Sequence, residues 1–133
     1  MLTLTLPVAP SVNSAWINRR GSRGRGRIKS AKYQAWLKQA DASYLLQKKE
    51  VLAVRGPYRC GMIFPRKLRG DLDNRTKLIL DWMVSRGLTS DDKFLQGLHC
   101  VRDDVPDGYV IVQVKEEGPH AGSFVSGATT LVE

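Results

Sequence analysis

The segment from Arg69 to Lys77 brings together residue types that can hold a metal ion and act on a phosphate group. Asp71 and Asp73 are two positions apart, so in an extended segment their side chains leave the same face of the backbone, while Leu72 turns to the other face. Two carboxylates held close together resist ionisation unless a cation lies between them. Magnesium suits such a pair, because it takes oxygen ligands and is usually bound by one or two carboxylates plus substrate phosphate. Lys77 follows about one helical turn later, so we expect its ammonium group to reach the same phosphate.

A simpler interpretation is that Asp73 or Asn74 only caps the helix that follows, since both residue types are preferred at that position. Capping does not exclude metal binding. The two carboxylates, the lysine and the basic chain around them together favour the metal site over capping alone.

Three other acidic motifs can be compared with this segment. An EF-hand loop that starts at Asp71 needs Asp or Asn at its fifth position, Gly at its sixth and Glu at its twelfth, where this chain has Arg75, Thr76 and Trp82. The nucleophilic aspartate of phosphatases follows a hydrophobic strand, whereas residues 66–70 are mostly basic. A sugar-transferase Asp-x-Asp matches equally well, but that class normally needs a nucleotide-sugar domain larger than this chain.

The composition points to an anionic partner. The chain has 133 residues, enough for one domain, and carries a formal charge of +8. Nucleic acid is the commonest partner of such a protein, and a membrane surface is the weaker alternative. We find no signal peptide or spanning segment and expect a cytoplasmic protein. Cys60 and Cys100 form no metal or redox motif, and His99 and His120 form no catalytic arrangement.

The periodicity predicts a small mixed α+β domain with about four strands and two main helices. The expected strands are Leu2–Leu6, Tyr58–Phe64, Leu98–Arg102 and Tyr109–Lys115, and the expected helices are Ser30–Lys48 and Asn74–Arg86. We expect the second helix to bury Leu78, Ile79, Trp82 and Met83, and to end at Gly87. The aromatic residues of the first helix hold helical spacing, so they are predicted to belong to the core rather than to stack on bases.

A flexible basic loop is predicted at residues 18–29, because six of the eleven residues from Arg19 to Lys29 are basic and three are Gly. We interpret it as a flap that contacts DNA, with an ordinary solvated loop as the alternative. Such contacts release counterions, so affinity should fall by about 10³-fold between low and moderate salt. The predicted DNA-binding residues are Arg19, Arg20, Arg23, Arg25, Arg27, Lys29, Arg66, Lys67, Arg69 and Arg75. Residues 118–133 are rich in Gly, Ser and Thr and are expected to form a disordered tail.

Several motifs in this order resemble the RusA family of Holliday junction resolvases. They are Pro10-Ser11-Val12-Asn13, Asp71-Leu72-Asp73-Asn74, Lys77 and Asp91-Asp92, and the resemblance covers about residues 1–117. It implies a RusA-like endonuclease domain at residues 1–117, in a small homodimer that is often encoded by a phage or prophage. The implied activity is magnesium-dependent resolution of four-way DNA junctions by paired symmetric nicks, in recombination and repair.

By position, the resemblance implies that Asp71, Asp73 and Asp92 are catalytic carboxylates that bind Mg²⁺, with Mn²⁺ as a possible substitute. Asp91 is a weaker candidate ligand, and Lys77 matches the catalytic lysine of the family. This chain departs from the family where Gly70 replaces a residue that is often basic. Two alternatives stay open: a basic DNA-binding protein without catalysis, and a metal nuclease for other branched DNA.

The position of Asp92 raises a geometric difficulty. A helix over residues 74–86 is about 20 Å long, so Asp92 begins at its far end and only a nearly extended return can bring it back to Asp71. Either the helix is shorter than predicted, or Asp92 serves the site of the partner subunit.

Overall fold

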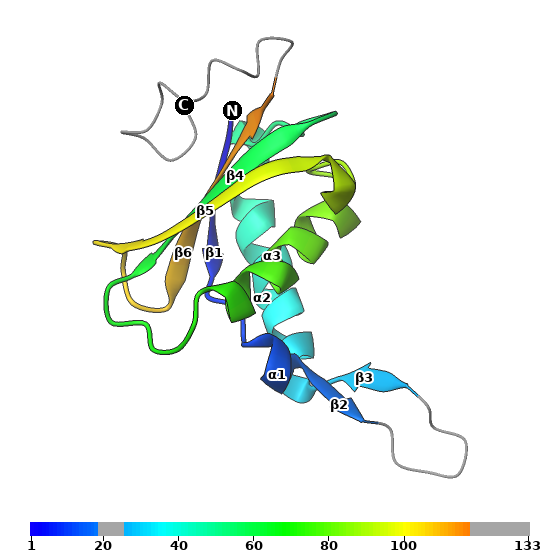
Figure 1. Ribbon diagram of the computed structural model, residues 1–133, viewed down its shortest axis with the longest axis vertical. Coiled ribbons are helices and arrows are strands. Elements are labelled where there is room, and N and C mark those ends of the chain that lie inside the picture. The colour runs from blue at the N-terminus through cyan, green and yellow to red at the C-terminus, as the bar shows by residue number, and fades with distance from the viewer. Residues whose placement is uncertain (19–25, 118–133) are drawn as a thin grey trace.

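The computed structural model describes residues 1–18 and 26–117 (Figure 1). The strands are β1 (Leu2–Pro7), β2 (Trp16–Asn18), β3 (Arg27–Lys29), β4 (Tyr58–Pro65), β5 (Leu95–Asp103) and β6 (Tyr109–Glu116). The α-helices are α1 (Val12–Ala15), α2 (Ala31–Gln47) and α3 (Asp73–Ser85), and two short 3₁₀ helices are η1 (Lys48–Glu50) and η2 (Asp92–Phe94). None of the helices within this part of the chain is long and apolar enough to cross a membrane.

The main sheet has four strands in the order β1-β6-β4-β5. β4 and β5 run parallel, and the other two pairs are antiparallel. A parallel pair needs a crossover between its strands, and α3 forms that crossover. The expected α+β fold with four main strands and two main helices is confirmed.

The basic segment differs from its prediction at both ends. Asn18 pairs with Arg27, and Trp16 with Lys29, so β2 and β3 form a separate two-stranded ribbon where a loop was expected. In Figure 1 this ribbon lies beside α1, away from the main sheet. Residues 19–25, and the expected tail at 118–133, lie outside the described residues.

The core fills the space between one face of the sheet and the helices α2 and α3 (Figure 1). Alternation with period two places one side of β1, β4 and β6 in this core. The fully buried strand residues include Leu2, Leu4 and Leu6 of β1, Tyr58, Met62 and Phe64 of β4, and Val110, Val112 and Val114 of β6. The predicted stripe of α3 is confirmed, since Leu78, Ile79, Trp82 and Met83 are all buried.

Helix α2 packs along β1 through aromatic and amide contacts. Ser30 caps the helix by accepting a hydrogen bond from Tyr33 N, and the Tyr33 and Trp36 side chains are buried as predicted for core residues. Trp36 Nε1 donates to Pro7 O at 2.8 Å. Near the end of α2, the Gln47 amide bonds both the N–H and the C=O of Thr5, each at 2.8 Å. α2 is therefore tied to the C-terminal half of β1 at two points, Thr5 and Pro7.

Helix α3 begins at Asp73 and ends at Ser85, one residue earlier at each end than predicted. Gly87 has φ +72°, and Leu88 N donates to Met83 O at 2.9 Å, which is the pattern of a glycine-terminated helix. The carboxylate of Asp41 on α2 accepts hydrogen bonds from Trp82 Nε1 and from the guanidinium of Arg86, which binds α3 to α2.

Candidate active site

Asp71 and Asp73 lie where the loop after β4 enters α3. Between them, Leu72 is partly buried against the core. Its backbone is helical, with φ −64° and ψ −36°, so the extended segment expected from Asp71 to Asp73 is not formed. Leu72 also occupies the N-cap position, with no side-chain capping bond, and Asp73 is the first helical residue. Capping by Asp73 or Asn74 therefore does not explain the acidic pair.

Both carboxylates are exposed, and no described side chain forms a hydrogen bond or ion pair with either of them. Asp73 nevertheless lies near the sheet. The pKa of the Cys100 thiol on β5 is raised to about 11, first by burial and then by the negative charge of Asp73. Two exposed carboxylates without a protein partner, in a chain of charge +8, leave their oxygen atoms available to a cation.

Lys77 lies one turn further along α3 and bridges two other carboxylates. Its Nζ atom is 3.0 Å from Asp81 Oδ1 and 3.2 Å from Asp92 Oδ2. These contacts, Asp81 first, raise the pKa of Lys77, so the side chain stays cationic at neutral pH. The pKa of Asp92 is lowered, first by its interaction with the neighbouring Asp91 carboxyl group and then by Lys77.

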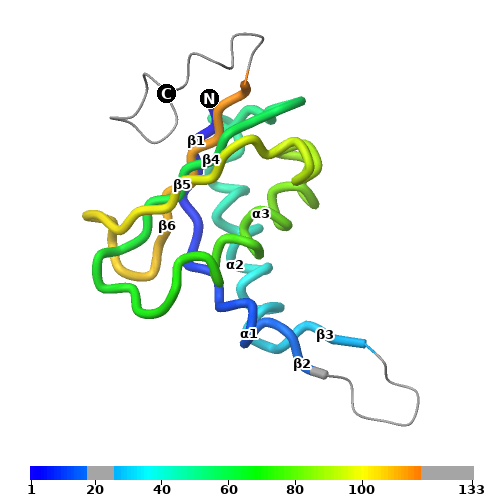
Figure 2. The backbone as a smooth tube through the Cα atoms, in the orientation of Figure 1, coloured from blue at the N-terminus to red at the C-terminus, as the bar shows by residue number. Residues whose placement is uncertain are grey.

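Asp92 reaches Lys77 of the same chain because the segment after α3 turns back along the helix. Figure 2 follows this path from the green helix through the turn and into β5. Val54 N donates to Leu88 O at 2.8 Å, and Gly56 N donates to Ser90 Oγ at 2.9 Å, which pins the returning segment. The distance from Ser85 back to Lys77 along the helix is about 12 Å. The six residues between Ser85 and Asp92 span about 20 Å when extended. The returning segment is therefore long enough to bring Asp92 back to Lys77.

The predicted three-carboxylate group is not assembled. Among residues 1–18 and 26–117, no three His, Cys, Asp or Glu side chains are close enough together to hold a metal ion. Asp71 and Asp73 form one part of the site, and Asp92 faces Lys77 in another. Asp91 accepts a hydrogen bond from Lys93 N at 3.1 Å and caps η2. The donor chemistry of Asp71 and Asp73 fits Mg²⁺, which needs only one or two protein carboxylates.

The predicted DNA-binding residues fall into different environments. Arg27 lies over the ring of Trp16 and Lys29 over the ring of Tyr33, at 5.2 and 5.7 Å. The side chains of Lys67 and Arg69 are exposed and have no described partner. Arg19, Arg20, Arg23 and Arg25 lie outside the described residues.

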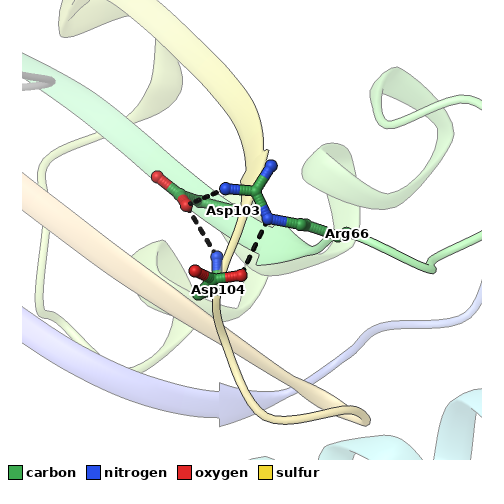
Figure 3. A network of polar contacts seen from close by, with 3 residues as sticks. All are labelled: Arg66, Asp103 and Asp104. Carbon is green, nitrogen blue, oxygen red and sulfur yellow. Dashed lines mark hydrogen bonds and ion pairs between the residues drawn. The ribbon is translucent and has the colours of Figure 1, made fainter.

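Arg66 and Arg75 are both engaged with other parts of the chain. Arg66 binds the carboxylates of Asp103 and Asp104, each at 2.8 Å, at the end of β5 (Figure 3). Arg75 donates to two backbone carbonyl groups, those of Ala9 at 2.8 Å and Arg69 at 3.3 Å. The guanidinium groups of Arg66 and Arg75 thus make these hydrogen bonds to other groups of the protein itself.

A cleft of about 600 Å³ opens beside Arg75. Its polar lining comes from the start of the chain, from α2 and from α3, and consists of Ser11, Ser14, Lys32, Gln39 and Arg75. It includes Pro10 and Ser11 of the N-terminal motif. The cleft adjoins the loop that carries Asp71, because Arg75 bonds both regions.

Two contributors to the site were not among the predicted site residues. Asp81 was expected only as a partner of Lys77, and Arg102 was not considered. Arg102 Nη2 donates to Gly70 O at 2.6 Å, and its Nε donates to Leu68 O at 3.2 Å. For Arg102, the one signal available in the sequence was that a charged residue stands at the end of an apolar strand.

Two comparisons with known proteins found relatives of this chain. The profile of the family described as "Endodeoxyribonuclease RusA" matches residues 6–115. The chain is 31% identical over 114 residues to the crossover junction endodeoxyribonuclease rusA of Enterobacteria phage HK97. The aligned region covers 84% of this chain and 91% of that protein. The residues matched by the family profile include Asp71, Asp73, Lys77 and Asp92. The chain therefore belongs to the RusA family of endodeoxyribonucleases.

Proposed function

We propose that this protein resolves four-way DNA junctions by paired symmetric nicks, as a homodimer that requires Mg²⁺. The observation that carries the proposal is the pair of exposed carboxylates, Asp71 and Asp73, one helical turn from Lys77. Membership of the endodeoxyribonuclease family supports the nuclease activity. The name of the phage HK97 relative supports the junction as substrate.

In this proposal Asp71 and Asp73 hold the metal ion. A Mg²⁺ ion held by these two carboxylates would supply Lewis-acid chemistry: it would polarise the scissile phosphate and lower the pKa of an attacking water molecule. Mn²⁺ takes similar oxygen ligands and is expected to substitute. The two side chains need no rearrangement of ion pairs to accept a cation, since neither has a partner among the described side chains.

Lys77 acts as a fixed positive charge. Its raised pKa keeps the ammonium protonated, so it serves to stabilise negative charge on the reacting phosphate rather than to abstract a proton. Asp81 and Asp92 orient this ammonium through contacts of 3.0 and 3.2 Å. The proposed part of Asp92 in metal binding requires its contact with Lys77 to give way.

The DNA is proposed to follow the basic residues that are not committed within the protein. Lys67 and Arg69 lie just before the acidic pair, and Lys32 lines the cleft beside Arg75. Arg27 and Lys29 on β3 belong to the predicted basic flap and are proposed to contact the DNA as well. Because such contacts release counterions, junction affinity should fall steeply as salt rises.

A homodimer accounts for paired nicks. A twofold axis relates two identical sites, and a symmetric four-way junction presents two equivalent strands to them. We infer that each site is complete within one subunit, because Asp92 meets Lys77 of its own chain.

The test compares a mobile four-way junction with a linear duplex of the same sequence, in Mg²⁺ and in EDTA. Wild type, Asp73→Asn and a control variant, Asp107→Asn, are assayed in parallel; Asp107 is an exposed residue in the turn before β6. We expect paired nicks on the junction alone, lost in EDTA and in Asp73→Asn and kept in Asp107→Asn. Equal cutting of flaps or replication forks would instead indicate a nuclease for other branched DNA. Tight binding without cleavage in Mg²⁺ or Mn²⁺ would leave a DNA-binding protein without catalysis.

A further inference from the structure

The loop that carries Asp71 makes few hydrogen bonds of its own. It joins the end of β4 at Pro65 to the start of α3 at Asp73. Within it, Leu68 N donates to Pro65 O at 3.2 Å, and Gly70 adopts φ +89°, a conformation that favours glycine. A loop of this kind depends on neighbouring elements to hold its backbone in one position.

Two arginine side chains supply that support. Arg102, on the adjacent strand β5, donates to Leu68 O at 3.2 Å and to Gly70 O at 2.6 Å. Arg75, on α3, donates to Arg69 O at 3.3 Å. Three consecutive carbonyl groups, immediately before Asp71, are therefore bound by two guanidinium groups.

Both arginines are held by elements outside the loop. Arg102 lies opposite Phe64 in the register of β4 and β5, and Phe64 is fully buried. Arg75 also donates to Ala9 O at 2.8 Å, which links the loop to the chain just after β1. The planar guanidinium presents several N–H groups in a fixed arrangement, whereas the single ammonium of lysine rotates freely. The contacts of Arg75 and Arg102 with the loop therefore require the shape of arginine as well as its charge.

The geometry points to Arg75 and Arg102 as positioning residues, which fix the backbone before Asp71 and so set the place of the acidic pair. This inference rests on the proposed role of Asp71 and Asp73. It also revises the expectation for Arg75, which was predicted to contact DNA. In this arrangement Arg75 acts on the loop. Lys67, an exposed residue of the same loop, stays available to phosphate.

The decisive variants keep the charge and remove the forked geometry: Arg102→Lys and Arg75→Lys. Hydrogen–deuterium exchange of residues 66–72 is measured by mass spectrometry without metal or DNA. We expect the hydrogen-bonded amide of Leu68 to exchange at least tenfold faster in each variant, with β1 and β6 unchanged as internal references. Exchange at wild-type rates would overturn the inference.

Kinetic measurements separate positioning from DNA contact. Misplacement of a reacting group by about 1 Å can cost about 10²-fold in rate. We expect each variant to lower kcat on the junction by 10- to 100-fold, to raise the Mg²⁺ concentration needed for half-maximal rate, and to keep the junction Kd in EDTA within threefold. Arg55→Gln, an exposed arginine away from the loop, controls for loss of charge and should match wild type.

Lys67→Gln provides the opposite pattern, with a weaker junction Kd and the larger effect on KM. A loss of junction affinity in Arg102→Lys as large as its loss of activity would show that Arg102 contacts DNA, and would overturn the inference. If wild type cleaves no DNA, the proposed function fails, and the exchange experiment still decides whether the two arginines hold the loop.

Discussion

The carboxylate of Asp41 joins the two main helices. The loss of stability that its removal causes can be estimated from its contacts. Asp41 Oδ1 accepts from Trp82 Nε1 at 2.9 Å and from Arg86 Nε at 2.6 Å. Trp82 is 1% exposed, so Asp41→Ala leaves a buried N–H without its acceptor, which costs about 1–3 kcal/mol. The side chains of Asp41 and Arg86 are 39% and 37% exposed, so solvent screening limits their ion pair to about 1 kcal/mol or less. We expect the free energy of unfolding to fall by about 2–3 kcal/mol.

The assay is urea unfolding followed by circular dichroism, on Asp41→Ala, Trp82→Phe and the double variant. Trp82→Phe removes the indole N–H and keeps an aromatic ring in the core. If the hydrogen bond carries the effect, Asp41→Ala should cost about 1 kcal/mol less in the Trp82→Phe background. An equal loss in both backgrounds would refute the reasoning, because it would mean that the indole contact contributes nothing.

The same carboxyl group predicts the pH dependence. Its hydrogen bonds, those from Arg86 first, lower the pKa of Asp41 in the folded protein. A group with a lowered folded pKa stabilises the protein above its unfolded pKa of about 3.9, and this contribution is lost as pH falls through the folded value. The difference in stability between wild type and Asp41→Asn should therefore narrow between pH 6 and pH 2. A constant difference would contradict this assignment.

Three further predictions follow from single features. Gly87→Ala should lower the free energy of unfolding by about 1–2 kcal/mol in urea, because Gly87 has φ +72° at the end of α3. Burial raises the pKa of Cys60 to about 12, so iodoacetamide at pH 8 should label this thiol only after unfolding, and rapid labelling of the native protein would disprove that burial. Mixed dimers of Asp71→Asn and Asp92→Asn subunits should regain no cleavage, because Asp92 meets Lys77 of its own chain; regained activity would mean that sites are shared.

The strands and helices of the core could be predicted because their signals are local. The alternation of Leu2, Leu4 and Leu6 and the apolar stripe of α3 each follow from the period of one element, and Gly87 marks the end of the helix. The β2–β3 ribbon was missed because its local signals are weak. Each of its strands has only three residues, and they flank a segment rich in Arg and Gly, a composition that does not distinguish a short strand from a loop.

The candidate site depended on contacts between distant residues, which spacing could not supply. The sequence identified Asp71, Asp73 and Lys77, but the contact of Lys77 with Asp92 rests on Val54 and Leu88 holding the return of the chain. Arginine partners are similarly non-local. Arg66 was predicted to contact DNA, yet its guanidinium binds carboxylates 37 and 38 residues away.

The order β1-β6-β4-β5 has a consequence for how the protein is made. β6 lies between β1 and β4, and within the described chain β1 pairs only with β6, in a register that sets Leu6 opposite Val110. On the ribosome, β1 is therefore synthesised first and has no strand to pair with until about 100 more residues have followed. Folding controlled by such distant contacts is slow compared with local helix formation. A growing chain that already contains Asp71, Lys77 and Asp92 thus lacks the completed sheet that holds them in place.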